Sequence, residues 1–234
     1  MSALNDAVLY LNDPLNWTRT NGLLDRLVEH VTISGVATAV AAVIALPLAI
    51  WFGHTGRGGG FTVALSNVSR AVPTLALLTV FAVTPIGFGN KATTIALALF
   101  AIPPILTNTY VGFREVDRDI LEAAGAMGMS PLQIVARVEL PLAIPAIMTG
   151  LRTAAVQVVA TATLAALVGG GGLGAPINLA FAQQDEGVLL AGAFLVAVLA
   201  LLTEAVLVLL ARLVTPGPAA RRLPRSLRLR TETV

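Results

Sequence analysis

The sequence contains no cysteine. Disulfides, thiol nucleophiles and thiolate metal ligands are therefore excluded. Its two histidines, His30 and His54, lie far apart and neither has partners at metal-ligand spacing, so no metal site is expected. No nucleophile–base pair suggests an intramembrane enzyme either, and we expect no catalytic residue in this chain.

Charge is scarce as well. Asp, Glu, Lys and Arg make up 12% of the residues, whereas soluble domains carry about 25%. Hydrophobic residues reach 56%, and the formal net charge is only +2, which leaves no electrostatic footprint for a nucleic acid. This composition indicates a membrane protein rather than a soluble or nucleic-acid-binding one.

Long apolar stretches also indicate a membrane protein. A bilayer core about 30 Å thick needs about 20 apolar residues in a helix. Five stretches are long enough, at about residues 31–52, 61–83, 92–111, 146–168 and 188–213. The second contains Arg70 and Pro73, so a shorter span with a bent or interfacial lead-in is an alternative there. The sequence predicts an all-α membrane protein with about five transmembrane helices.

The charged residues divide the chain into three parts and orient it. Residues 1–30 read as an extracytoplasmic or interfacial segment, without the basic start and apolar core of a signal peptide. Residues 31–213 form the transmembrane domain, and 214–234 form a basic tail. Basic loops stay in the cytoplasm, so the N-terminus is expected outside and the C-terminus inside. The tail sequence RRLPRSLRLR is either a topology anchor attracted to anionic lipid or a regulatory arm.

The predicted cytoplasmic loop at about 113–144 is polar but strongly patterned. Asp117 or Asp119 can cap a first helix, and Gly128 suits the left-handed residue that ends it. Ser130, followed three residues later by Gln133, has the capping-box spacing of a second helix. Pro141 and Pro145 are expected to end that helix before the fourth span. The loop is therefore predicted to be a rigid helix–turn–helix.

The same loop carries a family signature. EAAGAMGMSPLQIVARVELP, residues 122–141, resembles the EAA motif of ABC importer permeases, with valine at 138 where isoleucine is commoner. The resemblance implies a type I ABC importer permease core whose loop docks on an ATPase subunit. The residues expected to couple the two subunits are Glu122, Ala123, Ala124, Met127, Gly128, Met129 and Ser130. ATP and Mg²⁺ are expected on that partner, because this chain has no GxxxxGK[ST] loop.

The resemblance also implies further partners and a location. A second permease copy or a paralogue should complete the pore, and a separate extracytoplasmic protein should bind the substrate. Membrane lipid surrounds the spans, and the bacterial plasma membrane is the expected site.

Three stretches narrow the substrate: HTGRG at 54–58, RAVPTLALL at 70–78 and VVATATLAALVGGGGLGAPI at 158–177. They resemble permeases for glycine betaine, choline and carnitine. Importers of amino acids such as methionine share the architecture and stay open as an alternative. An ion-coupled secondary transporter would need more spans, a repeat and buried acidic relays, and a scaffold protein would need no EAA element.

Few residues suggest the pore itself. The pore or gate candidates are Arg70, Pro73, Gln157, Gly171 and Gly172. Ionisable groups inside predicted spans are costly, so Arg152 and Glu204 each need a reason: Arg152 can extend its charge toward the cytoplasm, and Glu204 can pair with another chain or a polar neighbour. The glycine run at 169–174 is either a flexible turn near the outer gate or a plain connector.

Overall fold

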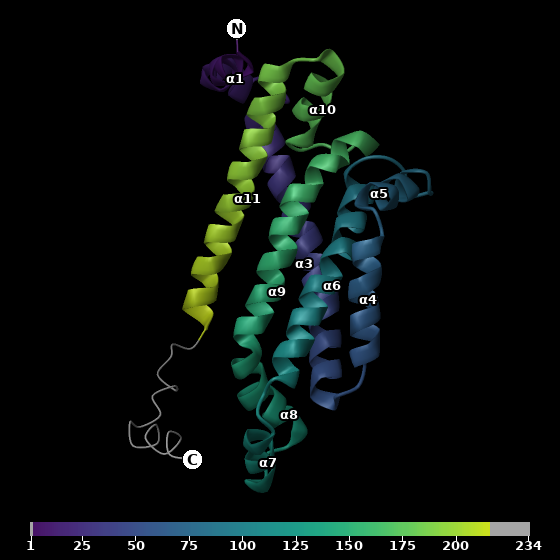
Figure 1. The fold of residues 1–234 in the computed structure, drawn as a ribbon, viewed down its shortest axis with the longest axis vertical. Coiled ribbons are helices and arrows are strands. Elements are labelled where there is room, and N and C mark those ends of the chain that lie inside the picture. Colours follow the sequence, from purple (N-terminus) through teal and green to yellow (C-terminus); the bar gives the residue numbers. More distant parts are fainter. Residues whose placement is uncertain (1, 216–234) are drawn as a thin grey trace, which may run out of the picture.

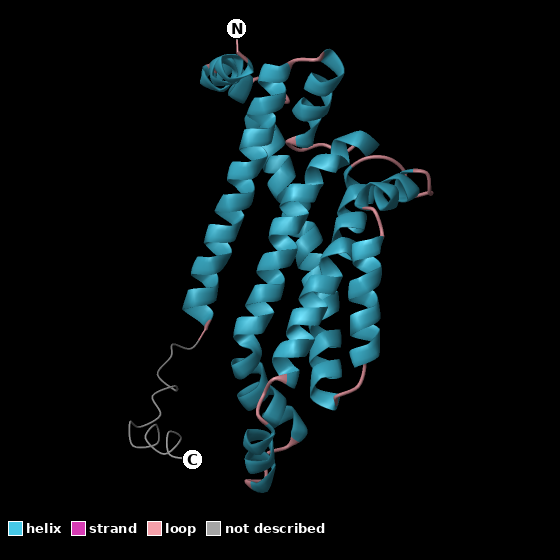
Figure 2. Ribbon diagram, in the orientation of Figure 1, coloured by secondary structure: helices cyan, strands magenta, loops and turns pink. Residues whose placement is uncertain are grey.

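The computed structural model describes residues 2–215, apart from the side chains of residues 70 and 71. The RRLPRSLRLR tail lies outside the described residues. Within the described range all regular structure is helical (Figure 2). The predicted all-α class is therefore confirmed for this part of the chain.

Four long helical segments run side by side along the long axis of the molecule (Figure 1). Their length and composition are sufficient to cross a membrane. They are α3 (Leu23–Thr55), α6 (Asn90–Arg114), the composite helix Pro131–Val168, and α11 (Glu186–Val214). The first of them begins at Leu23, earlier than predicted, after Gly22 as its N-cap.

Small side chains hold these helices together. One face of α3 is lined by alanines spaced four residues apart, each fully buried: Ala37, Ala41, Ala45 and Ala49. This face packs in one core with α6 and α9 (Leu140–Thr161). In lipid, where burial of apolar surface gives little drive for helix association, such small residues allow close backbone contact and strong van der Waals packing.

The predicted second span is bent rather than straight. It consists of α4 (Gly59–Ala71) and α5 (Thr74–Ala82), and the two axes differ by 85°. The break falls at Val72 and Pro73, because proline has no N–H to continue the hydrogen bonds of α4. α4 runs along the bundle, while α5 turns across its end (Figure 1). A single straight span over 61–83 is therefore wrong. The alternative of a shorter span with a bent or interfacial lead-in is right about the bend but not about its place, because the chain bends after α4.

The two prolines expected to end the second loop helix do not end it. The chain continues from α8 (Pro131–Ile134) through a π-helical segment (Val135–Glu139) into α9 and then a 3₁₀ segment (Ala162–Val168). Pro141 lacks an N–H and its ring would crowd the carbonyl four residues before it. The wider π turn, with the Leu140 N–H bonded to the Val135 carbonyl, accommodates that proline without breaking the helix.

The short helices mark the two ends of the bundle. α1 (Ala3–Asn12), α2 (Pro14–Thr18) and α10 (Gly174–Gln183) lie at one end, and α7 (Arg118–Ala126) lies with α8 at the other (Figure 1). α11 starts at the first end, where it packs on α1 and α10, and finishes toward the second. We call the first the α1 end and the second the α7 end.

Candidate functional site: a coupling segment, a polar cavity and a pinned glycine loop

The α7 end carries the predicted helix–turn–helix, residues 117–134, here called the coupling segment. The Asp117 side chain accepts a hydrogen bond from the Asp119 N–H and caps α7. Ser130 and Gln133 form a reciprocal capping box at the start of α8, as predicted. These short-range bonds fix both helix starts.

The turn between the two helices is a Schellman motif. Gly128 has a φ of +81°, the left-handed conformation expected for it. Its N–H donates to the Gly125 carbonyl at 2.9 Å, and the Met129 N–H donates to the Ala124 carbonyl at 3.2 Å. A Cβ at 128 would meet no atom within 4 Å, so the backbone conformation, not space, favours glycine there.

The exposed surface of the coupling segment is partly apolar. Met127 is 76% exposed, and Leu132, which sequence reasoning missed, is 77% exposed. Glu122, Ala123 and Ser130 also lie at the surface, and Met129 is half-buried, but Ala124 is buried against this chain itself. The available sequence signal for Leu132 was its position directly after Pro131, the proline that begins α8.

A hydrogen bond joins the π segment, which follows the coupling segment, to the end of α3. His54, near the end of α3, lies 2.6 Å from the buried Glu139 carboxylate in the π segment. The contact joins residues 85 positions apart, so no local sequence pattern indicates it. It ties the helix that leaves the coupling segment to the end of α3.

A polar cavity of about 490 Å³ lies between α4, α6 and α9. It brings together two of the predicted pore candidates, Pro73 at the α4–α5 break and Gln157 on α9. The other lining residues are Ser66, Ser69, Val72, Thr74, Phe100, Pro103, Pro104, Thr107, Asn108 and Thr153. None of these lining side chains is ionisable, so the described part of the wall offers dipoles rather than charges; the Arg70 side chain, next to Ser69, is outside the described residues.

Two polar side chains of α6 beside this cavity are not fully hydrogen-bonded. The Asn108 side chain donates from its amide nitrogen to the Pro104 carbonyl at 2.8 Å, and its amide oxygen can still accept a bond. The buried Thr107 hydroxyl has no hydrogen-bond partner among the described residues. The Asn108 amide oxygen and the Thr107 hydroxyl thus have unused bonding capacity in the wall of this cavity.

Two further pore candidates, Gly171 and Gly172, lie outside this cavity, in a loop at the α1 end. The Gly171 N–H donates to the Asn90 side-chain oxygen at 2.8 Å, and the Gly172 N–H donates to the Glu29 carboxylate at 2.7 Å. Asn90 also donates to Glu29 at 2.7 Å, and Arg26 forms an ion pair with Glu29 at 3.0 Å. The glycine run does connect the 3₁₀ segment to the short helix α10, but side chains of α3 and α6 pin it in place.

His30 completes the attachment of the loop. It is fully buried, and its Nδ1 accepts from the Leu173 N–H at 3.2 Å. Since Nδ1 accepts, the ring proton is on Nε2, which donates to the Val159 carbonyl at 2.9 Å. The neutral imidazole thus bridges α3, α9 and the glycine loop.

The structure separates the five gate candidates. Pro73 and Gln157 share the cavity, whereas Gly171 and Gly172 share the pinned loop. The backbone of Arg70 lies in the last turn of α4, and its side chain is outside the described part. Sequence reasoning missed Glu29, His30 and Asn90, for which the only signal was a polar residue inside or beside an apolar stretch.

The two ionisable residues inside the later spans pair with each other. The Arg152 guanidinium of α9 lies 3.3 Å from the Glu204 carboxylate of α11, and the two side chains are 39% and 40% exposed. Each charge therefore compensates the other within this chain. The described residues contain no group of three or more His, Asp or Glu arranged to hold a metal ion.

Comparison with known proteins shows the family of this chain. The model of the binding-protein-dependent transport system inner membrane component family matches residues 21–216. The chain is 36% identical over 209 residues to the choline transport system permease protein OpuBB of Bacillus subtilis, covering 88% of this chain and 96% of that protein. It is 34% identical over 215 residues to the carnitine transport permease protein OpuCD of Listeria monocytogenes, covering 91% and 96%.

Solved structures agree. An inward-facing structure of the MetNI methionine ABC transporter includes a chain that matches with a TM-score of 0.72 and 25% identity, over 88% of this chain and all of that one. Members of this family are non-catalytic permease subunits, and ATP hydrolysis belongs to a separate ATPase. The chain belongs to the family of binding-protein-dependent transport system inner membrane components and is a multi-pass permease subunit of an ABC importer.

Proposed function

We propose that this permease imports a small quaternary-ammonium osmoprotectant such as choline, glycine betaine or carnitine. Relatives at 34–36% identity over most of the chain carry transport names for these three solutes. That likeness is the observation that carries the proposal. The match to a methionine transporter supports the same fold with a lower identity of 25%.

The polar cavity suits such a solute. A quaternary ammonium has a delocalised charge and no N–H to donate, so it needs no tightly paired carboxylate in the pathway. Among the described lining residues, Gln157 and Asn108 provide amide dipoles and Thr107 a hydroxyl, and none of those residues is ionisable. We infer that this cavity is one half of the pathway, completed by a second copy of the chain or by a paralogue.

Coupling to ATP would run through the α7 end. We propose that Glu122, Ala123, Met127, Gly128, Met129, Ser130 and Leu132 contact the ATPase subunit, with Ala124 supporting them from within. When two ATPase subunits close on ATP, they would draw the paired coupling segments together. The rigid Schellman turn and the His54–Glu139 bond would then pass that motion to α9 and α3.

Uptake into proteoliposomes tests the proposal. The assembly would contain this chain, its ATPase and permease partners and the binding protein, and labelled choline, glycine betaine and methionine would be compared with and without ATP. ATP-dependent accumulation of choline or glycine betaine is expected. Methionine uptake alone would replace the substrate class while leaving the importer intact, and accumulation without ATP would contradict the importer itself.

A further inference from the structure

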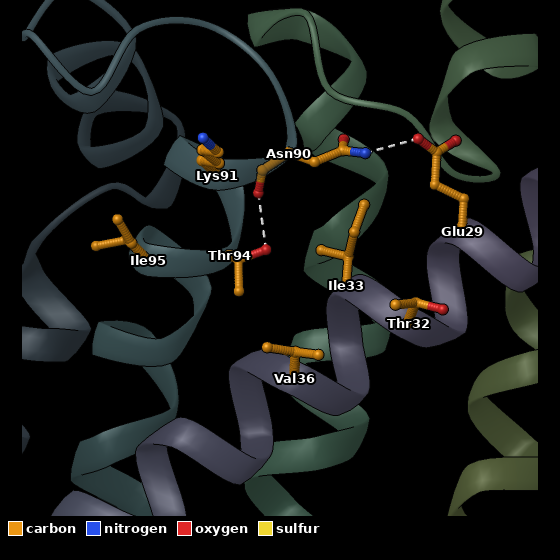
Figure 3. Close-up of a pocket in the computed structure, with 8 residues that line it drawn as sticks. All are labelled: Glu29, Thr32, Ile33, Val36, Asn90, Lys91, Thr94 and Ile95. Atoms are coloured by element: carbon orange, nitrogen blue, oxygen red, sulfur yellow. Dashed lines mark hydrogen bonds between the residues drawn. The ribbon is translucent and has the colours of Figure 1, made fainter.

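An apolar groove of about 520 Å³ runs between α3 and α6 at the α1 end (Figure 3). Four residues of each helix line it: Glu29, Thr32, Ile33 and Val36 from α3, and Asn90, Lys91, Thr94 and Ile95 from α6. The polar residues Glu29, Asn90 and Lys91 lie at its outer end, and the apolar ones lie further along the helices. The groove therefore changes from charged to apolar along the direction of the spans.

Its two threonines do not make it polar. The Thr32 hydroxyl donates to the Val28 carbonyl at 2.7 Å, and the Thr94 hydroxyl donates to the Asn90 carbonyl at 2.7 Å. Both hydroxyls are thus bonded to their own helices. Below its mouth, the groove can offer only dispersion contacts to an occupant.

The charges at the mouth leave one cation without a partner. Glu29 is neutralised by Arg26 and also accepts bonds from Asn90 and Gly172. Lys91 is exposed, and no hydrogen bond or ion pair of its ammonium occurs among the described residues. The start of α6 beside it adds a positive dipole end. The mouth therefore carries a net charge of one positive unit.

The groove also faces away from the polar cavity. At about 100° per residue, the α6 residues that line the groove point on average about 140° away from those that line the cavity. If the cavity faces the pathway and the second permease, the groove faces the lipid. This placement favours a lipid occupant over a second copy of the chain.

We propose that the groove binds one glycerophospholipid, with its phosphodiester beside Lys91 and an acyl chain along Ile33, Val36 and Ile95. One phosphodiester carries one negative charge, which matches the mouth. From Glu29 to Val36 the helix rises about 10 Å, roughly a third of a bilayer core. The lipid belongs to the leaflet at the α1 end, opposite the coupling segment.

Native mass spectrometry of the whole permease–ATPase complex, extracted from membranes containing phosphatidylglycerol, tests this site. Lys91→Ala should lower the retained phosphatidylglycerol about fivefold, as expected for losing one basic contact at a lipid surface. Arg19→Ala is the matched control, because Arg19 lies at the same end but does not line the groove. Equal losses in both variants, or no loss in Lys91→Ala, would overturn the proposal.

A second pair of variants tests the apolar part. Val36→Trp should fill the groove and displace the lipid, whereas Val43→Trp, at an α3 position that is 74% exposed and outside the groove, should not. Because the chain has no cysteine, Val36→Cys also asks whether a second copy covers the groove. Disulfide-linked permease dimers from that variant would show a protein interface there and reject the lipid site.

Discussion

The Glu29 side chain connects three parts of the chain at the α1 end. Its carboxylate joins α3 to the start of α6 through Asn90 and to the glycine loop through Gly172. The arrangement works because the loop residues have no side chains. A Cβ on Gly171 would overlap the Glu29 carboxylate, and one on Gly172 would come within 2.9 Å of His30. Glycine is needed here for close approach, in addition to the positive φ of Gly172.

Gly171→Ala should therefore destabilise the protein. The added methyl displaces the Glu29 carboxylate and leaves the bonds to Asn90 and Gly172 strained or broken. We expect a loss of about 1–3 kcal/mol in the free energy of unfolding, measured as a lower midpoint for thermal unfolding of the purified complex. Gly35→Ala is the control, because a Cβ there meets nothing within 4 Å. A midpoint equal to that of Gly35→Ala would show that the loop does not depend on this contact.

The Arg152–Glu204 pair makes a second prediction at the residue scale. Glu204→Ala leaves an uncompensated guanidinium in a membrane-spanning segment, and should cost about 1–3 kcal/mol of unfolding free energy. The double variant Arg152→Ala with Glu204→Ala should cost less than the sum of the two single changes, because it removes both charges. Thermal unfolding of the four proteins forms the cycle. Strict additivity would mean that the two groups do not interact in the membrane.

At the scale of elements, α8 of the coupling segment, the π segment and α9 form one continuous helix. α8 passes into the π turn and then into α9, which carries Gln157 in the polar cavity. A break at Pro141 would have made the coupling segment an independent loop. Because the helix continues, a displacement of α8 moves α9 directly, and the His54–Glu139 bond carries part of it to α3.

Gly128→Val should uncouple transport from ATP. Valine is strongly disfavoured at the φ of +81°, so the turn between α7 and α8 would distort. We expect ATP-driven uptake to fall about tenfold or more at unchanged membrane levels, since a cost above about 1.4 kcal/mol to the docked form is a tenfold effect. Gly128→Asn, which tolerates this conformation, should keep most of the uptake. Normal uptake by the valine variant would refute the coupling role.

At the scale of the whole molecule, the bundle has two chemically different ends. The α1 end carries the amphipathic helix α1, the pinned loop and the lipid groove, and the α7 end carries the coupling segment (Figure 1). Arg114, Arg118 and Arg137 gather at the α7 end or beside it. By the rule that basic loops stay inside, this end is expected in the cytoplasm.

Cysteine labelling measures that orientation. In the cysteine-free chain, a cysteine at the exposed Thr55, the last residue of α3 on the side of the α7 end, should react with a membrane-impermeant maleimide only after the cells are permeabilised. A cysteine at Leu15, which is 69% exposed near the α1 end, should react in intact cells. The reverse pattern would invert the topology, and with it the sides assigned to the binding protein and the ATPase.

Features that depend on neighbouring residues were predictable from the sequence. The caps at Asp117, Gly128 and Ser130 rest on hydrogen bonds to residues two or three positions away, and those predictions are confirmed. Apolar composition located the spans but not their full lengths, since α3 begins at Leu23 and the predicted span at about residue 31. The remaining features depend on tertiary packing. It placed Pro73 beside Gln157, and it paired Glu29 with Gly172 across 143 positions. Apolar helices resemble one another in composition, so which faces meet, and which polar groups then find each other, depends on the packing of small residues over the whole bundle.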